Sequence, residues 1–426
     1  MATRRVYRPM AKEKIVVGLD IGSANVKIAV GILKNDAERP EILGVKAVPS
    51  SGVRKGVVVE IKEVVASTAK AIEMVETVAG VTVASVVASV NGTHVNMRKT
   101  KGVVVVSRAD NEISEGDVER ALDAAKTISL PANREIITVI PLVYNVDGEM
   151  GIKDPVGMNG VKLEAEAVLI DALSPAIKNL RKCINETRLD IDALIPAGLA
   201  AAQSLLNKKQ LDLGTAVVDV GAGTTSIAVY EEGKLIHFKV FPVGGAHITN
   251  DIAIGLRTST EVAEEVKLRY GNALPANVNK KDVINMAEFG ADLNFKIAAT
   301  QLTEIIEARV SEIFELLNKE LKSIDRKGLL PGGIVFAGGG IKIPGTVELA
   351  KEIFKLPAQI GATQNVSGVL DEMHDPIYAA CLGLVKEGLG NGEEQAATPS
   401  RRGIAIPNIK IKHGFDIRKF IKSFIP

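Results

Sequence analysis

The chain has 426 residues, of which 46% are hydrophobic, and its 52 basic and 51 acidic residues leave a net charge of +1 at pH 7. This length and composition predict a globular protein of two or three domains and exclude an intrinsically disordered chain. The near-neutral charge argues against a global electrostatic field that attracts nucleic acid, so we expect no nucleic-acid partner.

The N-terminal residues 1–13 contain three arginines, but no apolar run of signal-peptide length follows them. No stretch of about eighteen uncharged apolar residues occurs elsewhere in the sequence. We therefore expect a disordered N-terminal tail and a cytoplasmic protein that does not span the membrane.

The predicted elements alternate between strands and helices, which indicates an α/β fold. Residues 14–30 have the pattern strand, tight turn, strand, and residues 215–230 repeat it. Between them, a helix at 60–78 ends at Gly80, and a block that contains a helix started by Ser114 predicts a small α+β subdomain. In this block we expect strands at 84–90, 102–107, 135–143 and 161–170 and a helix at 115–128. Further helices are expected at 175–187, within 246–271 and at 293–323.

The repeated strand-turn-strand pattern contains the residues on which the predicted chemistry depends. Asp20 and Asp219 each close an apolar strand, a glycine-rich turn follows, and a second strand resumes with Ile-Ala-Val. Two such hairpins facing each other predict a clamp for a polyphosphate, because glycine lets backbone N–H groups come close and carboxylates hold hydrated Mg²⁺. Side-chain donors to phosphate oxygens are expected from Ser23, Asn25, Lys27, Thr224 and Thr225.

A single Asp-x-Gly sequence is also ordinary turn chemistry, so the hypothesis depends on two matched copies. A third signal is the apolar strand that runs into Gly338, Gly339 and Gly340, whose backbone we expect to approach a nucleoside. Taken alone, a glycine triplet is equally compatible with a plain loop.

In this order and spacing, the three motifs resemble the phosphate-1, phosphate-2 and adenosine motifs of the actin, heat-shock-70 and sugar-kinase superfamily. Within it, the segments 20–27, 151–158, 194–200 and 244–253 resemble those of the bacterial cell-division family FtsA. The resemblance covers residues 14–385 and the C-terminal tail.

The resemblance implies a two-lobed actin-like fold that binds ATP with Mg²⁺ between its lobes. It also implies that Glu264 and Lys267 contact the ribose and adenine, although a solvent-facing ion pair is the alternative for two residues three apart on one helix face. The predicted metal ligands are Asp20 and Asp219. The predicted nucleotide-binding residues are Gly22, Ser23, Asn25, Lys27, Gly221, Gly223, Thr224, Thr225, Gly245, Glu264, Lys267, Gly338, Gly339, Gly340 and Lys342.

The expected domain organisation follows from the same resemblance. The first lobe is expected at 14–82 and 168–190, the FtsA-type inserted subdomain at 83–167, and the second lobe at 191–387 with a helical subdomain at about 246–318. The polar, turn-rich segment 388–403 predicts a flexible linker, and 404–426 a membrane-targeting tail.

The tail has the pattern of a short basic amphipathic helix. Ile417, Phe420, Ile421 and Phe424 fall on one helical stripe, and basic residues surround the other side. Such a segment after a linker predicts an interfacial membrane anchor, and a terminal helix docked on the body is the alternative. The predicted membrane-binding residues are Ile417, Arg418, Lys419, Phe420, Ile421, Lys422 and Phe424.

One departure from the superfamily pattern bears on catalysis. Bacterial relatives with a Glu-Pro element orient the attacking water there, whereas this chain has Pro196 and Ala197, with Gln203 further along as a substitute. We therefore expect ATP binding with at most slow hydrolysis.

Three functions remain open at this point. The first, which the resemblance implies, is an actin-like protein that polymerises on the inner face of the cell membrane, recruits later division proteins and binds the C-terminal peptide of the tubulin-like protein FtsZ through the helical subdomain. The alternatives are a pilus-assembly ATPase and a small-molecule kinase of the same superfamily. No candidate catalytic base for a kinase stands out, and a kinase has no evident use for the tail.

Overall fold

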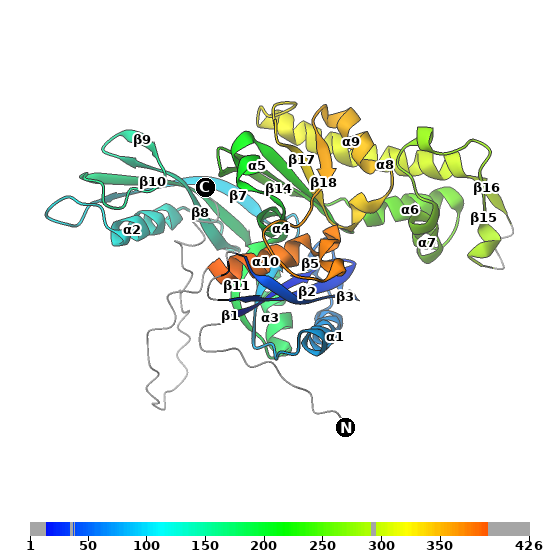
Figure 1. The fold of residues 1–426 in the computed structure, drawn as a ribbon, viewed down its shortest axis with the longest axis horizontal. Helices are drawn as coiled ribbons and strands as arrows, with labels where there is room; N and C mark the ends of the chain where they lie inside the picture. The colour runs from blue at the N-terminus through cyan, green and yellow to red at the C-terminus, as the bar shows by residue number, and fades with distance from the viewer. Residues whose placement is uncertain (1–13, 35–36, 38, 291–294, 391–426) are drawn as a thin grey trace, which may run out of the picture.

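The computed structural model describes residues 14–34, 37, 39–290 and 295–390. The predicted N-terminal tail, most of the linker and every predicted membrane-binding residue lie outside these described residues. Within them, two five-stranded sheets repeat one strand order, β11-β6-β1-β2-β3 in the first and β18-β17-β12-β13-β14 in the second (Figure 1). The repeat that the sequence predicts is therefore a repeat of whole sheets.

The first sheet is built around the hairpin of β1 (Lys14–Ile21) and β2 (Asn25–Leu33), in which Asp20 lies opposite Lys27. β1 is apolar along most of its length because both faces of the sheet are covered. Helices pack on one face, and α10 packs on the other. The remaining elements are β3 (Glu41–Pro49), β4 (Val53–Arg54), β5 (Val57–Val58), β6 (Ser85–Val90), β11 (Asp190–Pro196), α1 (Ile61–Ala79), α3 (Ser174–Glu186) and α10 (Ala379–Gly390).

The second sheet is built in the same way around β12 (Thr215–Val220) and β13 (Thr225–Glu231), in which Asp219 lies opposite Ser226. In both sheets the strand that carries the aspartate has a parallel neighbour on its other side, β6 beside β1 and β17 beside β12. The other elements of this lobe are β14 (Lys234–Phe241), β17 (Gly333–Ala337), β18 (Ala358–Ile360), α5 (Lys208–Leu213), α8 (Ala299–Ser323) and α9 (Thr346–Phe354).

Helix α4 (Ala197–Leu205) lies between the two lobes, and all nine of its residues are buried. It packs against α10 from the first lobe and against β12 and β13 from the second. Gly383 of α10 makes this packing tight, because a Cβ there would lie 1.7 Å from the carbonyl oxygen of Ala200. The two sheets therefore share one continuous core through α4.

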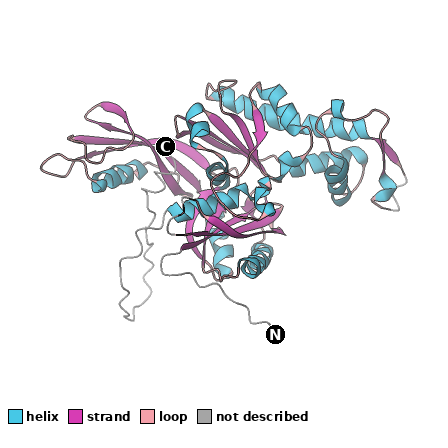
Figure 2. Cartoon of the chain, in the orientation of Figure 1, coloured by secondary structure: helices cyan, strands magenta, loops and turns pink. Residues whose placement is uncertain are grey.

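Two further parts extend from opposite sides of this centre. The inserted subdomain is a sheet of order β7-β10-β8-β9 with α2 packed on one face. The other part is mostly helical, as Figure 2 shows, and it begins directly after β14. The inserted elements are β7 (Asn96–Val105), α2 (Glu115–Lys126), β8 (Arg134–Val146), β9 (Glu149–Ile152) and β10 (Lys162–Leu173). The helical part has α6 (Gly245–Leu256), α7 (Thr260–Tyr270), β15 (Val283–Asn285) and β16 (Lys296–Ala298) before α8.

The structure differs from the predicted boundaries at several places. β6 and β11 pair with each other in the first sheet, although the predicted boundaries assign β6 to the inserted subdomain and β11 almost wholly to the second lobe. Helix α10 also packs on the first sheet and continues to Gly390, so the predicted linker cannot begin at Gly388. A Cβ at Gly388 would lie 2.5 Å from the side chain of Val16, so this residue contacts β1 directly.

Candidate functional site

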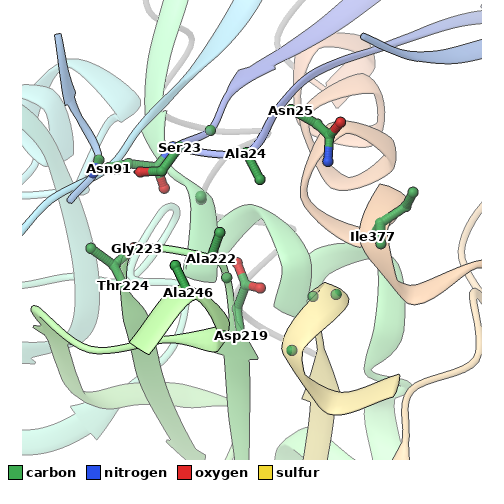
Figure 3. A pocket seen from close by; sticks show the side chains of 18 of the residues that line it. Ser23, Ala24, Asn25, Asn91, Asp219, Ala222, Gly223, Thr224, Ala246 and Ile377 are labelled. Atoms are coloured by element: carbon green, nitrogen blue, oxygen red, sulfur yellow. Dashed lines mark hydrogen bonds between the residues drawn. The ribbon is translucent and has the colours of Figure 1, made fainter. Parts of the chain in front are cut away.

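A cavity of about 550 Å³ lies where the two aspartate-bearing hairpins face each other. In Figure 3 the turn after β1, with Ser23 and Ala24, lies opposite the turn after β12, with Ala222 and Gly223, and Asp219 lies on the β12 side. Both turns close with the same hydrogen bond, from the Gly22 N–H to the Asn25 carbonyl at 3.0 Å and from the Gly221 N–H to the Thr224 carbonyl at 2.9 Å. The cavity is lined by the predicted residues Asp20, Gly22, Ser23, Asn25, Lys27, Asp219, Gly221, Gly223, Thr224, Gly245, Glu264, Lys267, Gly338, Gly339, Gly340 and Lys342.

The start of α6 is hydrogen-bonded to the turn that follows β12. The N–H of Gly245 donates to the carbonyl of Gly221 at 2.8 Å, and the N–H of Ala246 donates to that of Ala222 at 2.9 Å. Gly244 is required for this approach, because a Cβ there would lie 2.4 Å from the Gly221 oxygen. The N-terminal end of α6, which favours anions, therefore borders the cavity.

Asp20 is almost fully buried, and its carboxylate has three partners. The Ser89 hydroxyl and the Asn91 amide donate to Oδ1 at 2.6 and 3.1 Å, and Lys27 Nζ lies 2.5 Å from Oδ2. Burial alone would raise the pKa of Asp20, but the charge of Lys27 and these hydrogen bonds hold it below its ordinary value. Burial also opposes the charge of Lys27, yet the two aspartates raise its pKa.

Asp219 is in the opposite situation. Burial and the neighbouring Asp20 raise its pKa to about 6, and the attraction of Lys27 compensates this in part. Two carboxylates therefore share one lysine, which leaves negative charge that a further cation would neutralise. Among the described residues no group of three or more His, Cys, Asp and Glu side chains could hold a metal ion by itself. Mg²⁺ commonly keeps several waters and uses one or two carboxylates together with phosphate oxygens, so the pair Asp20 and Asp219 fits that cation.

The far end of the cavity is formed by α7 and the glycine triplet. Lys267 is 8% exposed, and its Nζ lies 2.6 Å from Glu264 and 2.8 Å from the Thr249 hydroxyl. The alternative of a solvent-facing ion pair is therefore wrong for Lys267. Gly339 to Lys342 form a 3₁₀ turn, and α9 begins at Thr346.

Thr225 is the one predicted nucleotide-binding residue that does not line the cavity within the described structure. Its side chain is buried, and its hydroxyl donates to the carbonyl of Val243 at 2.8 Å. Thr225 is the first residue of β13 and lies opposite Val220 in the hairpin, whereas Thr224 belongs to the turn. The prediction for Thr225 was wrong because neighbouring residues of a strand point to opposite faces.

Gln203 does not reach the cavity either. It is buried in α4, and its side-chain oxygen accepts a hydrogen bond from Lys386 at 3.1 Å. Ala197 and Gly198 instead line the cavity at the start of this helix. Within the described structure, Gln203 is therefore not placed to orient an attacking water.

Several lining residues were missed by the sequence analysis. Four of them lie outside the recognised motifs, namely Gly56, Asn91, Leu268 and Ile377, and Ser226 lies in the second hairpin. A usable signal existed for Asn91, which follows an apolar strand directly and precedes a glycine. The carboxyl ends of parallel neighbouring strands meet at one edge of a sheet, so a polar residue after β6 is expected close to one at the end of β1.

Comparison with known proteins decides the family. A model for the cell division protein FtsA matches residues 216–383, and one for the SHS2 domain inserted in FtsA matches residues 92–171. The cell division protein FtsA of Pseudomonas aeruginosa is 37% identical over 88% of this chain and 89% of its own length. The chain belongs to the FtsA family. The FtsA proteins of Bacillus subtilis and Escherichia coli K12 are 37% and 36% identical over 91% and 90% of this chain, which is 86% and 93% of their own lengths.

Solved structures agree with an actin-like fold for this FtsA family member. A PilM–PilN type IV pilus biogenesis complex matches with a TM-score of 0.63 at 18% identity, covering 88% of this chain and 98% of that one. MreB5 of Spiroplasma citri bound to ADP matches with a TM-score of 0.52 at 14% identity, covering 89% and 99%. At these identities the likeness shows the fold alone, and it confirms the predicted fold class. Among the described residues, no helix has the length and apolar character to cross a membrane.

Proposed function

We propose that the chain binds ATP with Mg²⁺ in the cavity between its lobes, polymerises on the inner face of the cell membrane and anchors FtsZ there, recruiting later division proteins. The observation that carries the nucleotide part is the pair of glycine turns that bring Asp20 and Asp219 to one cavity. MreB5 of Spiroplasma citri, which has a similar fold, has been solved with ADP and with AMPPNP. FtsA family membership supports the cell-division part and favours it over the pilus-assembly and kinase alternatives.

The lining residues divide into three roles. The turns at Gly22 and Gly221 present backbone N–H groups to phosphates, and Lys27 supplies a positive charge beside them. Asp20 and Asp219 hold the hydrated cation, which neutralises the phosphates when it is bound. The nucleoside end is formed by Glu264, Lys267, Lys342 and the glycine triplet 338–340.

Hydrolysis in this site should be slow. Phosphoryl transfer to water depends on a residue that orients the attacking molecule. At the segment where the bacterial relatives with Glu-Pro carry that residue, Ala197 and Gly198 face the cavity and offer no side-chain donor or acceptor. The bound nucleotide then acts mainly as a structural ligand.

The FtsZ-binding surface is proposed on the helical subdomain, whose basic side chains differ in how available they are to a partner. Lys267 faces the cavity, and Arg309 is already paired with Asp251 at 2.5 Å, so neither basic side chain is freely available to a partner. Arg257 is exposed at the end of α6, and Ile254 beside it is 77% exposed. These two residues offer the combination of charge and apolar area that a peptide with both features requires.

Sedimentation with anionic vesicles tests the membrane and FtsZ parts together. With Mg-ATP, the full chain should pellet with the vesicles and carry FtsZ with it, whereas the chain ended after Gly403 should stay in the supernatant. Ile254→Glu should lose FtsZ but keep the vesicles, and Val369→Glu, at a residue 98% exposed elsewhere on the body, should lose neither. Pelleting of the shortened chain as efficiently as the full chain would contradict the anchor assignment.

A further inference from the structure

Asn91 joins the cavity to the point where the chain enters the inserted subdomain. It follows β6 directly and precedes Gly92, where the match to the SHS2 domain begins. Its side-chain amide donates to Asp20 Oδ1 at 3.1 Å and to the carbonyl of Ile21 at 3.4 Å. Asn91 is one of the lining side chains labelled in Figure 3. The amide of Asn91 therefore connects the carboxylate of Asp20 to residues 91–94, where the chain enters the inserted subdomain. We call this segment the root of the inserted subdomain.

The segment after Asn91 is also held from the side of the β4–β5 hairpin. A Cβ at Gly56 would lie 2.6 Å from the backbone nitrogen of Gly92 and 2.9 Å from the Cβ of Asn91. The Gly56 N–H donates to the Ser23 hydroxyl at 3.0 Å. Asn91 is thus packed between two loops that line the cavity, and a shift of either loop displaces it.

Arg134 continues the connection into the inserted subdomain. Its guanidinium donates to the carbonyl of His94 at 2.6 Å and forms an ion pair with Asp171, which is fully buried. Arg98 approaches the other oxygen of the same carboxylate at 2.7 Å. Gly92 and Asp171 are the two ends of the SHS2 match, so Arg134 connects the segment that enters the inserted subdomain with the strand that leaves it.

These contacts form one unbroken chain, from Asp20 through the Asn91 side chain and the backbone of residues 91–94 to Arg134 and Asp171. Asp20 and Asp171, the two ends of this chain of contacts, are buried, and a buried acceptor that loses its partner is costly. Asn91 and His94, which lie between them, are half-buried. Any ligand that changes the position or charge of Asp20 therefore also changes the contacts at the root of the inserted subdomain.

We propose that Asn91 is a positioning residue that couples the Asp20 side of the cavity to the root of the inserted subdomain. A bound Mg-nucleotide orders that root, and an ordered root strengthens nucleotide binding by the same factor, because coupling between two sites is reciprocal. The inference rests on the proposed function, since it takes Mg-ATP as the ligand of the cavity.

Hydrogen–deuterium exchange of the full chain, with and without Mg-ATP, tests the coupling. Peptides that cover residues 92–100 and 134–138 should exchange more slowly in the wild type with Mg-ATP, by at least about 5-fold, the lower end of ordinary coupling factors. Asn91→Ala should bind Mg-ATP more weakly, because the reciprocal coupling is lost, and at saturating Mg-ATP it should lose this difference. Asn185→Ala, at an exposed asparagine of α3 in the same lobe, should keep it.

Arg134→Lys provides a second variant at the other end of the chain of contacts. Lysine keeps the positive charge but cannot contact His94 and Asp171 together as the guanidinium fork does. This variant should still bind Mg-ATP, but about 5-fold or more weakly because the reciprocal coupling is lost, and at saturating Mg-ATP it should lose the change in exchange at residues 92–100. A structural role alone would leave the nucleotide-dependent difference in place.

The outcomes distinguish a failure of the proposed function from a failure of the coupling. A wild type that fails to bind Mg-ATP overturns the proposed function. A wild type that binds Mg-ATP without slower exchange at the root overturns the coupling, and so does an unchanged response in either Asn91→Ala or Arg134→Lys.

Discussion

Replacing Asp219 with asparagine should stabilise the nucleotide-free protein while removing a proposed ligand of the cation. The pKa of this carboxyl is about 6 in the folded protein, against 3.8 for an ordinary aspartate. The difference is about 2 pKa units at about 1.36 kcal/mol each, so ionised Asp219 costs the folded state about 3 kcal/mol at neutral pH. Asparagine has nearly the same shape and carries no charge to bury.

The sign of the pH dependence follows from the direction of the shift. Because the folded pKa is raised, the favourable contribution of the protonated carboxyl is complete below the unfolded value of 3.8 and is lost as the pH rises through about 6. The advantage of Asp219→Asn over the wild type should therefore grow between about pH 4 and pH 6 and stay constant above pH 7.

Thermal unfolding of the wild type and of Asp219→Asn between pH 4.5 and 8, in EDTA and again with Mg-ATP, measures this difference in stability. In EDTA the variant should unfold several degrees above the wild type at pH 7.5 and differ less at pH 4.5. With Mg-ATP the wild type should gain stability by mass action and the variant should gain much less. Asp212→Asn, at an exposed aspartate on α5, should behave as the wild type does. A variant that is less stable than the wild type in EDTA at pH 7.5 would refute this reasoning.

Three further predictions concern the glycine triplet, the buried ion pair and hydrolysis. Gly338→Ala should destabilise the protein by about 1 to 3 kcal/mol more than Gly151→Ala. Both glycines have φ near +84°, so the backbone strain is matched. A Cβ at Gly338 would lie 2.4 Å from a carboxylate oxygen of Asp219, whereas a Cβ at Gly151 would have no atom within 4 Å. Equal unfolding midpoints would contradict the clash. Lys27→Met should cost about 3 kcal/mol in chemical unfolding at pH 7, because it leaves a buried carboxylate without its cation. Lys34→Met, in an exposed pair, should cost less than about 1 kcal/mol, and a similar loss in both variants would count against a buried pair. Phosphate release from Mg-ATP should stay below about 1 s⁻¹, and a faster rate would show that another group orients the water.

The paired hairpins were predictable from the sequence because they are local and occur twice. Asp20 and Asp219 each end a strand whose glycine turn and returning strand are contiguous in the chain, so pattern and turn chemistry suffice. The structure confirms the predicted actin-like fold, and it brings both aspartates to one cavity.

What the sequence analysis missed depends on pairing between distant segments. Asn91 and Ser89 reach Asp20 because β6 lies beside β1, about seventy residues away in the chain. The position of β11 in the first sheet likewise results from its pairing with β6 and leaves no mark in local composition. Thr225 shows a different limit, since a shift of one residue at the start of a strand turns the side chain away from the site.

Titration calorimetry of ATP against the wild type, with Mg²⁺ and again with EDTA, tests the central claim most directly. The wild type should bind ATP with 1:1 stoichiometry, and its affinity should fall when Mg²⁺ is removed. Asp20→Asn and Asp219→Asn should each lower the affinity in Mg²⁺, and Asp212→Asn should leave it unchanged. Equal ATP affinity in Asp219→Asn and the wild type, in the presence of Mg²⁺, would contradict the assignment of the two aspartates to one cation site.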